Sequence, residues 1–358
     1  MTPREAFHAM MAGERPDVLC QFEPGYWPET VERWRSEGLA AGVEPWDDCG
    51  IIHYFRPEIA WGIYPPFPMV VLEEDADSRV IRNESGIVCR ESKHGRCLPQ
   101  FIDHPVKNRD DFEALKERLD PTTPGRYPAD WDVWVQSAKT SPHLWCIGRR
   151  DNGFFGWLRE LMGLEGLLLA YVDQPELIHT ICRYHVGYLQ GLYAKALREA
   201  PIDFVFMWED MAYKNGPLIS PAFFREFMLP YYREMVDFYR QMGARWITVD
   251  SDGDIHLLIP LFLEAGIDGL LPFEVAAGMD VRKVREQYPT LKILGGIDKR
   301  ALARGKAAID AELEAKLPVM FRAGRFLPSL DHHVPPDVSY ENFRYYLERS
   351  REIYAKSR

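Results

Sequence analysis

The chain has 358 residues, of which 46% are hydrophobic and 27% are charged, and its 54 Asp and Glu against 43 Lys and Arg give a formal net charge of −11. A chain of this size and composition can build a globular core without disulfide or metal staples. The acidic balance argues against nucleic-acid binding, because phosphate contacts require a basic face. No segment reaches the ~18 apolar residues of a membrane span.

The N-terminus is typical of a helix start and not of a secretion signal. Thr2-Pro3-Arg4-Glu5 has capping-box spacing with proline at the first helical position, and no apolar signal region follows. None of the cysteines form a CxxC pair; they are Cys20, Cys49, Cys89, Cys97, Cys146 and Cys182. Since nothing indicates a disulfide framework, we expect a reducing, cytoplasmic environment.

Short apolar runs alternate with helix-length segments along most of the chain. The predicted strands are 18–22, 50–54, 143–148, 203–208, 245–249, 268–273, 292–297 and 325–330. Amphipathic stretches such as 221–242 and 254–265 lie between them. Strands separated by helices imply βαβ units and a parallel sheet, and seven or eight such units predict a (β/α)₈ TIM barrel. The alternative is an open doubly wound sheet, although its GxGxxG fingerprint is absent.

Residues from about 61 to 120 interrupt this alternation. A proline-rich stretch at 64–68 precedes β-rich runs at 69–72, 80–82 and 87–90, and a helix is predicted at 110–119. We interpret this part as a hairpin-rich excursion, followed by a loop at 121–125. Because the chain has no long linker or internal repeat, we expect a single domain spanning 1–358.

Charged residues gather where the predicted strands end, which is where a parallel barrel places its chemistry. The acidic ones are Glu23, Glu209, Asp210, Asp250, Asp252, Glu274, Asp298 and Asp331. The basic ones are Arg149, Arg150, Lys214 and Lys299. Acids crowded at one rim repel each other unless a cation lies among them. A structural alternative is helix capping, for which Asp254 and Asp298 are candidates.

The pair Asp250-x-Asp252 is the sharpest local feature. Residues two apart at a strand end point the same way, so the two carboxylates converge. They predict either a metal site or a base whose neighbour raises its pKa. A calcium loop is excluded, because Ile255 stands where glycine is required and Leu261 where glutamate is required.

His332 and His333 follow the last predicted strand. If His332 meets Asp250 and Asp252, the three side chains supply two oxygens and one nitrogen, a set suited to zinc, manganese or iron. The alternative is a pair of hydrogen-bonded loop histidines. Aromatic residues flank the same loops and predict an apolar wall for a planar or bulky ligand, although some belong to the core: Tyr26, Trp27, Phe154, Phe155, Trp157, Trp208 and Tyr213.

Several stretches resemble the uroporphyrinogen decarboxylase superfamily, which includes corrinoid and coenzyme M methyltransferases. They are Gly216-Pro217-Leu218-Ile219-Ser220-Pro221, the run 227–232 (FMLPYY), 263–268 (LEAGID), Gly295-Gly296-Ile297-Asp298-Lys299, and His332-His333-Val334-Pro335-Pro336 followed by Glu341-Asn342. The resemblance covers most of the chain. It implies a (β/α)₈ barrel with its site at the carboxyl ends of the strands.

Two departures from the family pattern bear on the activity. The decarboxylases of this family carry an arginine-rich loop after the first strand, where this chain has Glu23 and Tyr26. The thiol-activating methyltransferases carry a His-x-Cys pair and a later cysteine as zinc ligands, where this chain has Asp250, Asp252 and His332. We therefore expect neither heme-pathway decarboxylation nor a thiolate-rich zinc site.

The resemblance implies an enzyme that moves a methyl group between a methylated small molecule, or a methyl-corrinoid, and an acceptor. Asp250, Asp252 and His332 would hold zinc or another divalent metal, or polarise the acceptor. The predicted acid–base or cation-binding residues are Glu209, Asp210 and Glu274. The predicted substrate-binding residues are Glu23, Tyr26, Trp27, Arg149, Arg150, Phe154, Tyr213, Lys214, Asp298 and Lys299.

Two other functions stay open at this stage. One is a decarboxylase or lyase acting on a small carboxylate or porphyrinogen, for which Arg149, Arg150 and Lys214 supply a basic pocket. The other is a non-catalytic binding partner of a corrinoid protein. The expected partners are a small-molecule substrate, a corrinoid protein that supplies its cofactor, and a second copy in a homodimer, with no nucleic acid and no membrane.

Overall fold

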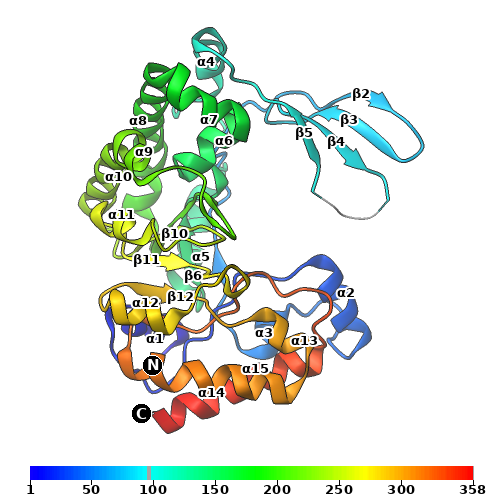
Figure 1. Ribbon diagram of the computed structural model, residues 1–358, viewed down its shortest axis with the longest axis vertical. Helices are drawn as coiled ribbons and strands as arrows, with labels where there is room; N and C mark the ends of the chain where they lie inside the picture. Colours follow the sequence, from blue (N-terminus) through cyan, green and yellow to red (C-terminus); the bar gives the residue numbers. More distant parts are fainter. Residues whose placement is uncertain (95–97, 358) are drawn as a thin grey trace.

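A curled parallel sheet forms the centre of the computed structural model, which describes residues 1–94 and 98–357 (Figure 1). Its hydrogen-bonded order is β1-β6-β7-β10-β11-β12-β13. The strands are β1 (Tyr54–Phe55), β6 (Leu144–Ile147), β7 (Phe204–Trp208), β10 (Ile247–Asp250), β11 (Gly269–Leu271), β12 (Lys292–Leu294) and β13 (Phe326–Leu327). Each overlaps a predicted run and every pairing is parallel, so the expected parallel α/β architecture is confirmed.

The predicted first strand at 18–22 forms no strand. Phe22 makes a single parallel bridge to Ile52, and on its other side the Glu23 carboxylate accepts a hydrogen bond from the Leu330 amide at 3.0 Å. Prolines explain the missing ladders: Pro24 follows Glu23 directly, and Pro328 ends β13 after two residues. The eight-stranded barrel that we predicted is thus not confirmed; seven strands pair, and an irregular segment lies between the first and the last of them.

Helices cover the outside of the sheet. They include α1 (Pro3–Ala12), α2 (Pro28–Ser36), α3 (Pro45–Cys49), α5 (Trp131–Thr140), α6 (Phe155–Met162), α7 (Leu164–Asp173), α8 (Pro175–Glu199), α10 (Leu229–Gln241), α11 (Ile259–Glu264), α12 (Val281–Gln287), α13 (Lys299–Ala303), α14 (Lys306–Ala323) and α15 (Tyr340–Ser357). The capping box at Thr2 is confirmed: the Thr2 side chain accepts a hydrogen bond from the Glu5 amide, and the Glu5 carboxylate accepts one from the Thr2 amide. Within the described ranges, no helix is both long and apolar enough to cross a membrane.

Two predicted helices are interrupted. The stretch 221–242 consists of α9 (Pro221–Phe223), a π-helical turn (Phe224–Met228) and α10, since Pro230 has no N–H to continue a regular ladder. The stretch 254–265 contains only α11. Asp254 does not cap it, because its carboxylate accepts from the backbone of His256, three residues before the helix begins.

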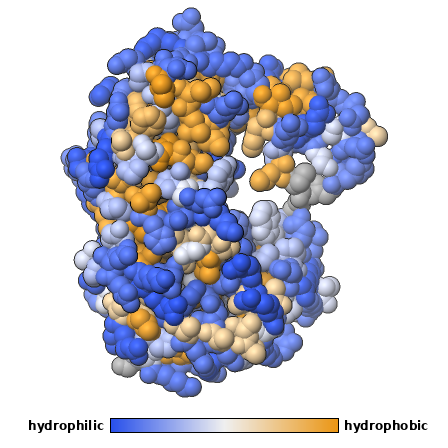
Figure 2. All heavy atoms as spheres, viewed as in Figure 1, coloured by the Kyte–Doolittle hydropathy of each residue, from blue (hydrophilic) through white to orange (hydrophobic). Residues whose placement is uncertain are grey.

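The hairpin-rich excursion is confirmed as an antiparallel arm of four strands that projects from the body formed by the parallel sheet and its helices (Figure 1). Its strands are β2 (Val70–Glu74), β3 (Ser78–Arg82), β4 (Val88–Ser92) and β5 (Gln100–Asp103), and α4 (Arg109–Leu115) follows. Exposed large hydrophobic side chains gather on it, as the orange atoms of the arm in Figure 2 show; they are Met69, Val71, Leu72, Leu98, Phe101 and Ile102. Cys97 lies outside the described residues, and the other five cysteines are free and buried.

Glu23 closes the gap between the sheet's two ends, and its protonation makes a testable contribution to stability. Burial raises the pKa of Glu23 from its ordinary value of 4.5 to about 8. Between these two pH values the folded protein keeps a proton on Glu23 that the unfolded chain has released. The contribution is therefore full below pH 4.5 and declines as pH rises toward 8.

The Glu23→Gln variant should remove this decline, because its amide keeps the Leu330 contact and donates to the Tyr346 hydroxyl. We expect it to gain on the order of 2 kcal/mol over the wild type between pH 5 and pH 8, measured by urea unfolding. Glu286→Gln, an exposed change on α12, is the control. Parallel stability curves for wild type and Glu23→Gln would contradict the assignment.

Candidate active site

The end of β10 brings two carboxylates into one environment. Asp250 is the last residue of the strand, and Asp252 follows in the loop with its side chain about one third exposed. Burial raises the pKa of Asp250 well above its ordinary value, with Asp252 and Asp210 adding to the shift and Arg56 opposing it. Burial, Asp210 and Glu274 raise the pKa of Asp252 to about 7. The pair therefore carries a proton that is exchangeable near neutral pH.

His332 lies beside Asp252. Its Nε2 is 3.6 Å from the Asp252 carboxylate, and its ring stacks on Trp27 with ring centroids 6.3 Å apart. Burial lowers the pKa of His332, and Lys299 lowers it further, so the imidazole is neutral at pH 7. His333 packs against Gly25 and the same Trp27 ring, and burial lowers its pKa to about 4. The two histidines thus share Trp27, and His332 is the one that approaches Asp252.

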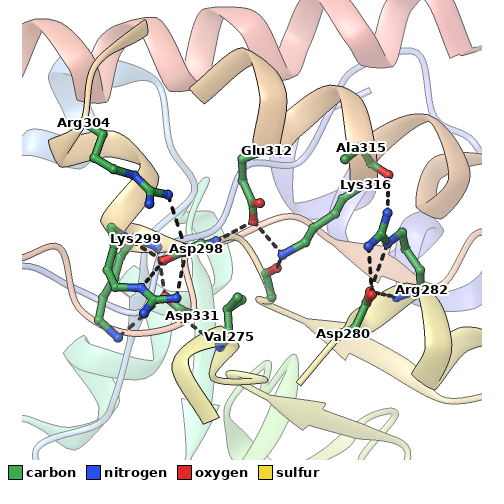
Figure 3. A network of polar contacts seen from close by, with 12 residues as sticks. Val275, Asp280, Arg282, Asp298, Lys299, Arg304, Glu312, Ala315, Lys316 and Asp331 are labelled. Atoms are coloured by element: carbon green, nitrogen blue, oxygen red, sulfur yellow. Dashed lines mark hydrogen bonds and ion pairs between the residues drawn. The ribbon is translucent and has the colours of Figure 1, made fainter. Parts of the chain in front are cut away.

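A network of ion pairs fixes the loops after β11, β12 and β13 (Figure 3). Asp331 is fully buried; it accepts hydrogen bonds from the amides of Val275 at 2.8 Å and Lys299 at 3.0 Å, and the Lys299 ammonium lies 3.6 Å away. Asp298 caps α13 and pairs with Arg300. The capping alternative is thereby confirmed for Asp298, whose carboxylate is held by its own helix.

The loop after β11 is tied to the loop after β10. Glu274, half-buried, accepts a hydrogen bond from the Gly253 amide at 3.2 Å. Because Gly253 follows Asp252 directly, this contact holds the Asp252 loop in place, and Glu274 lies close enough to raise the pKa of Asp252. Of the residues that we predicted, the structure brings together Asp210, Asp250, Asp252, Glu274, Lys299 and His332, with Asp331 beside them.

Glu209 and Phe154 serve the framework around this cluster. Glu209 is fully buried, and its carboxylate accepts hydrogen bonds from the amides of Phe154 at 2.7 Å and Gly156 at 2.8 Å and from the Tyr232 hydroxyl. A carboxylate here satisfies the open N–H groups at the start of α6. The Phe154 ring is buried against Tyr232. Sequence position alone could not separate Glu209 from its neighbour Asp210.

Asp210 differs from Glu209 because it stays half-buried at the rim. Its backbone has a φ of 47°, which turns the chain sharply after β7. Its carboxylate pairs with Arg159 at 3.1 Å while its charge acts on Asp250 and Asp252. The turn thus buries Glu209 against the start of α6 and leaves Asp210 between Arg159 of α6 and the cluster.

The other predicted substrate-binding residues lie in two cavities and on a hairpin whose Tyr213 carbonyl accepts a hydrogen bond from the Asp254 amide. Arg149 and Arg150 line a cavity of about 480 Å³ at the base of the arm, where Arg150 lies over the Trp208 ring. Glu23 and Tyr26 line another cavity of about 380 Å³ between α2 and α3. Tyr213 and Lys214 are exposed on the short hairpin of β8 (Ala212–Tyr213) and β9 (Gly216–Pro217).

Arg56 is the basic residue that sequence reasoning missed. It follows β1 directly, and its charge acts on Asp250. The signal that identified the other residues, a charged side chain just after a predicted strand, applies to Arg56 as well. The predicted run 50–54 ended one residue before β1 does, which left Arg56 outside the residues considered.

The donors present do not fit the predicted metal site. Among residues 1–94 and 98–357, no group of three or more His, Cys, Asp and Glu side chains is arranged to hold a metal ion. Asp252 and His332 do approach each other, but Asp250 does not complete a set with them. The zinc or other divalent metal stays a prediction that the geometry does not support.

Comparisons with known proteins bear on the fold and the family. A methyltransferase from Methanosarcina mazei matches over 98% of both chains with a TM-score of 0.61 and 17% identity, which shows a shared fold. A candidate vitamin-B12-independent methionine synthase from Listeria monocytogenes covers 95% of this chain and 98% of its own, with 12% identity; its TM-score of 0.37 is too low to carry an argument. No curated protein matches by sequence.

The family model for uroporphyrinogen decarboxylase (URO-D) matches residues 154–353. That range runs from the loop after β6 to the last helix and includes the Asp250, Asp252 and His332 positions. It covers more than half of the chain and confirms the resemblance seen in the sequence. The chain belongs to the uroporphyrinogen decarboxylase family.

Proposed function

We propose that this chain is a methyltransferase-like enzyme in which Asp252 accepts the proton that a methyl acceptor releases. The observation that carries the proposal is the Asp250–Asp252 pair at the end of β10, where a carboxyl group with a pKa of about 7 lies beside a more strongly protonated one. A base of this pKa suits proton transfer at neutral pH. Family membership and the fold shared with a methyltransferase support the reaction class.

The proposed methyl transfer needs a cationic methyl donor, a protic acceptor and a base, and Asp252 supplies the base. The lone pair of a protic acceptor A–H attacks the methyl carbon of a cationic donor, and the bond from that carbon to nitrogen breaks with its electrons left on nitrogen. The acceptor proton passes to the Asp252 carboxylate. The products are the methylated acceptor, a neutral amine and a protonated Asp252, which returns its proton to water.

The charge of the site favours a cationic methyl donor. Asp210, Asp250, Asp252 and Glu274 act on one another electrostatically, so a cation entering among them relieves repulsion. Trp27, 42% exposed beside His332, offers an aromatic face of the kind that binds quaternary ammonium groups. A methyl-corrinoid carried by a partner protein is the other methyl source that the family resemblance implies.

Asp252→Asn should lower methyl transfer by about 100-fold or more, because the amide cannot accept the proton. The measurement is mass spectrometry of trideuteromethyl transfer from tetramethylammonium, choline or glycine betaine to a small thiol. Asp237→Asn, an exposed change on α10, is the matched control and should keep wild-type turnover. Full activity in Asp252→Asn, or release of carbon dioxide without methyl transfer, would contradict the proposal.

The proposal also fixes the pH dependence. The base must be ionised, so kcat/KM should rise tenfold per pH unit below about 7 and level off above it. Far-UV circular dichroism over the same range separates this effect from unfolding. A profile that is flat or falling between pH 6 and pH 8 would exclude Asp252 as the base.

Metal analysis tests the part of the sequence prediction that the geometry does not support. After supplementation with zinc, manganese and iron, we expect well under one bound metal per chain, because the described residues form no set of three donors. The measurement is plasma mass spectrometry of the wild type, Asp250→Ala and His332→Ala. About one metal per chain, lost in both variants, would support the predicted metal site at Asp250, Asp252 and His332 and would contradict the role of Asp252 as a base.

A further inference from the structure

We propose that Arg56 is an anion-binding subsite that holds a carboxylate of the substrate at the carboxyl-end mouth of the parallel sheet. The proposal rests on the function proposed above and extends it, because it names a second chemical group on the substrate. It comes from the way in which Arg56 is fixed and left without a counter-ion.

Contacts on three sides position the Arg56 guanidinium. Its Nε donates a hydrogen bond to the carbonyl of Gly148, at the end of β6, at 2.8 Å. Its central carbon lies 4.8 Å from the centroid of the Tyr54 ring and 4.9 Å from that of Phe206. The side chain is half-buried at the end of β1, so two rings and one carbonyl hold a planar fork in a defined orientation.

The charge of this fork is not neutralised within the described part of the chain. Three other arginines near the strand ends are paired: Arg159 with Asp210 at 3.1 Å, Arg150 with Glu160 at 3.3 Å, and Arg300 with Asp298 at 2.8 Å. Arg56 forms no ion pair with a carboxylate whose side chain the structure describes, and Asp250 acts on it only as a more distant charge. Partial burial makes an unpaired cation costly, so an anion bound at Arg56 is stabilised.

The shape of the fork selects the anion. The guanidinium donates to the Gly148 carbonyl and also hydrogen-bonds the Tyr54 side chain. Its remaining N–H groups suit a carboxylate, which presents two oxygens to a guanidinium fork. A guanidinium keeps its charge at every physiological pH, so this subsite does not depend on a titration.

The subsite lies across the mouth from the acidic cluster. Arg56 and Asp250 act on each other's charge without forming an ion pair, and the ends of β6 and β7 lie between them in the sheet order. A substrate held by its carboxylate at Arg56 therefore extends toward Asp250 and Asp252. We infer a zwitterionic methyl donor that has a carboxylate at one end and a methylated cationic centre at the other.

Acetate is the probe for the subsite, because its binding requires no turnover. Saturation-transfer NMR and thermal shift should show acetate binding to the wild type, with acetamide, its neutral analogue, binding much more weakly. Arg56→Met should weaken acetate binding about tenfold or more. The control is Arg245→Met at the opposite end of β10. It removes an exposed arginine that, like Arg56, lies over an aromatic ring, here that of Trp246, and it should bind acetate as the wild type does.

Kinetics then separate this inference from the proposed function. Arg56→Met should raise KM for glycine betaine about tenfold and leave KM for choline, which lacks the carboxylate, unchanged. Equal acetate binding in wild type and Arg56→Met, or no acetate binding to the wild type, would overturn the subsite while methyl transfer still stood. If Arg56→Met does not fold, Arg56→Lys, which keeps the charge but loses the fork, must bind acetate less tightly than the wild type; equal binding would overturn the subsite as well.

Discussion

Repulsion among carboxylates at one end of a parallel sheet is the constraint on which this site depends. Parallel strands bring their carboxyl ends together, so the acids that follow β7, β10, β11 and β13 share one partly buried mouth. Each acid must be neutralised by a base, by backbone N–H groups or by a proton. How these three means are distributed decides which acids hold the structure and which remain available for chemistry.

Most of the acids are neutralised by the framework. Glu209 receives the amides at the start of α6, Asp298 caps α13, and Asp331 receives two amides and the Lys299 ammonium. In the part of the chain that the structure describes, no backbone amide donates to the carboxylates of Asp250 and Asp252, and His332 is the one base within 4 Å of Asp252. Their repulsion is relieved by retaining a proton. Residues that look alike in the sequence thus divide into structural and reactive groups according to what the neighbouring loops donate to them.

The sequence predicted well those elements that depend on residues close to one another in the chain. Runs of apolar residues located all seven paired strands, turn chemistry located the hairpin arm, and cap preferences located Thr2 and Asp298. It failed where two distant segments decide together. The first strand was lost because Pro24 and Pro328, more than 300 residues apart, both interrupt the same ladder. The role of Glu209 was missed because α6 supplies its partners from another part of the chain.

Arg56 shows why the function is harder to predict than the fold. Arg56 follows a strand as the other charged residues of the site do, but nothing in the sequence shows that it has no carboxylate partner. Arg159 and Arg150 are each matched by a nearby acid, whereas Arg56 is held by a carbonyl and two rings that position it without neutralising it. An ion pair between Arg56 and Asp250 would neutralise both charges. The mouth would then have neither an anion-binding site nor a carboxyl group with a raised pKa. The separation between them keeps the mouth polarised, with one end suited to an anion and the other to a cation or a proton.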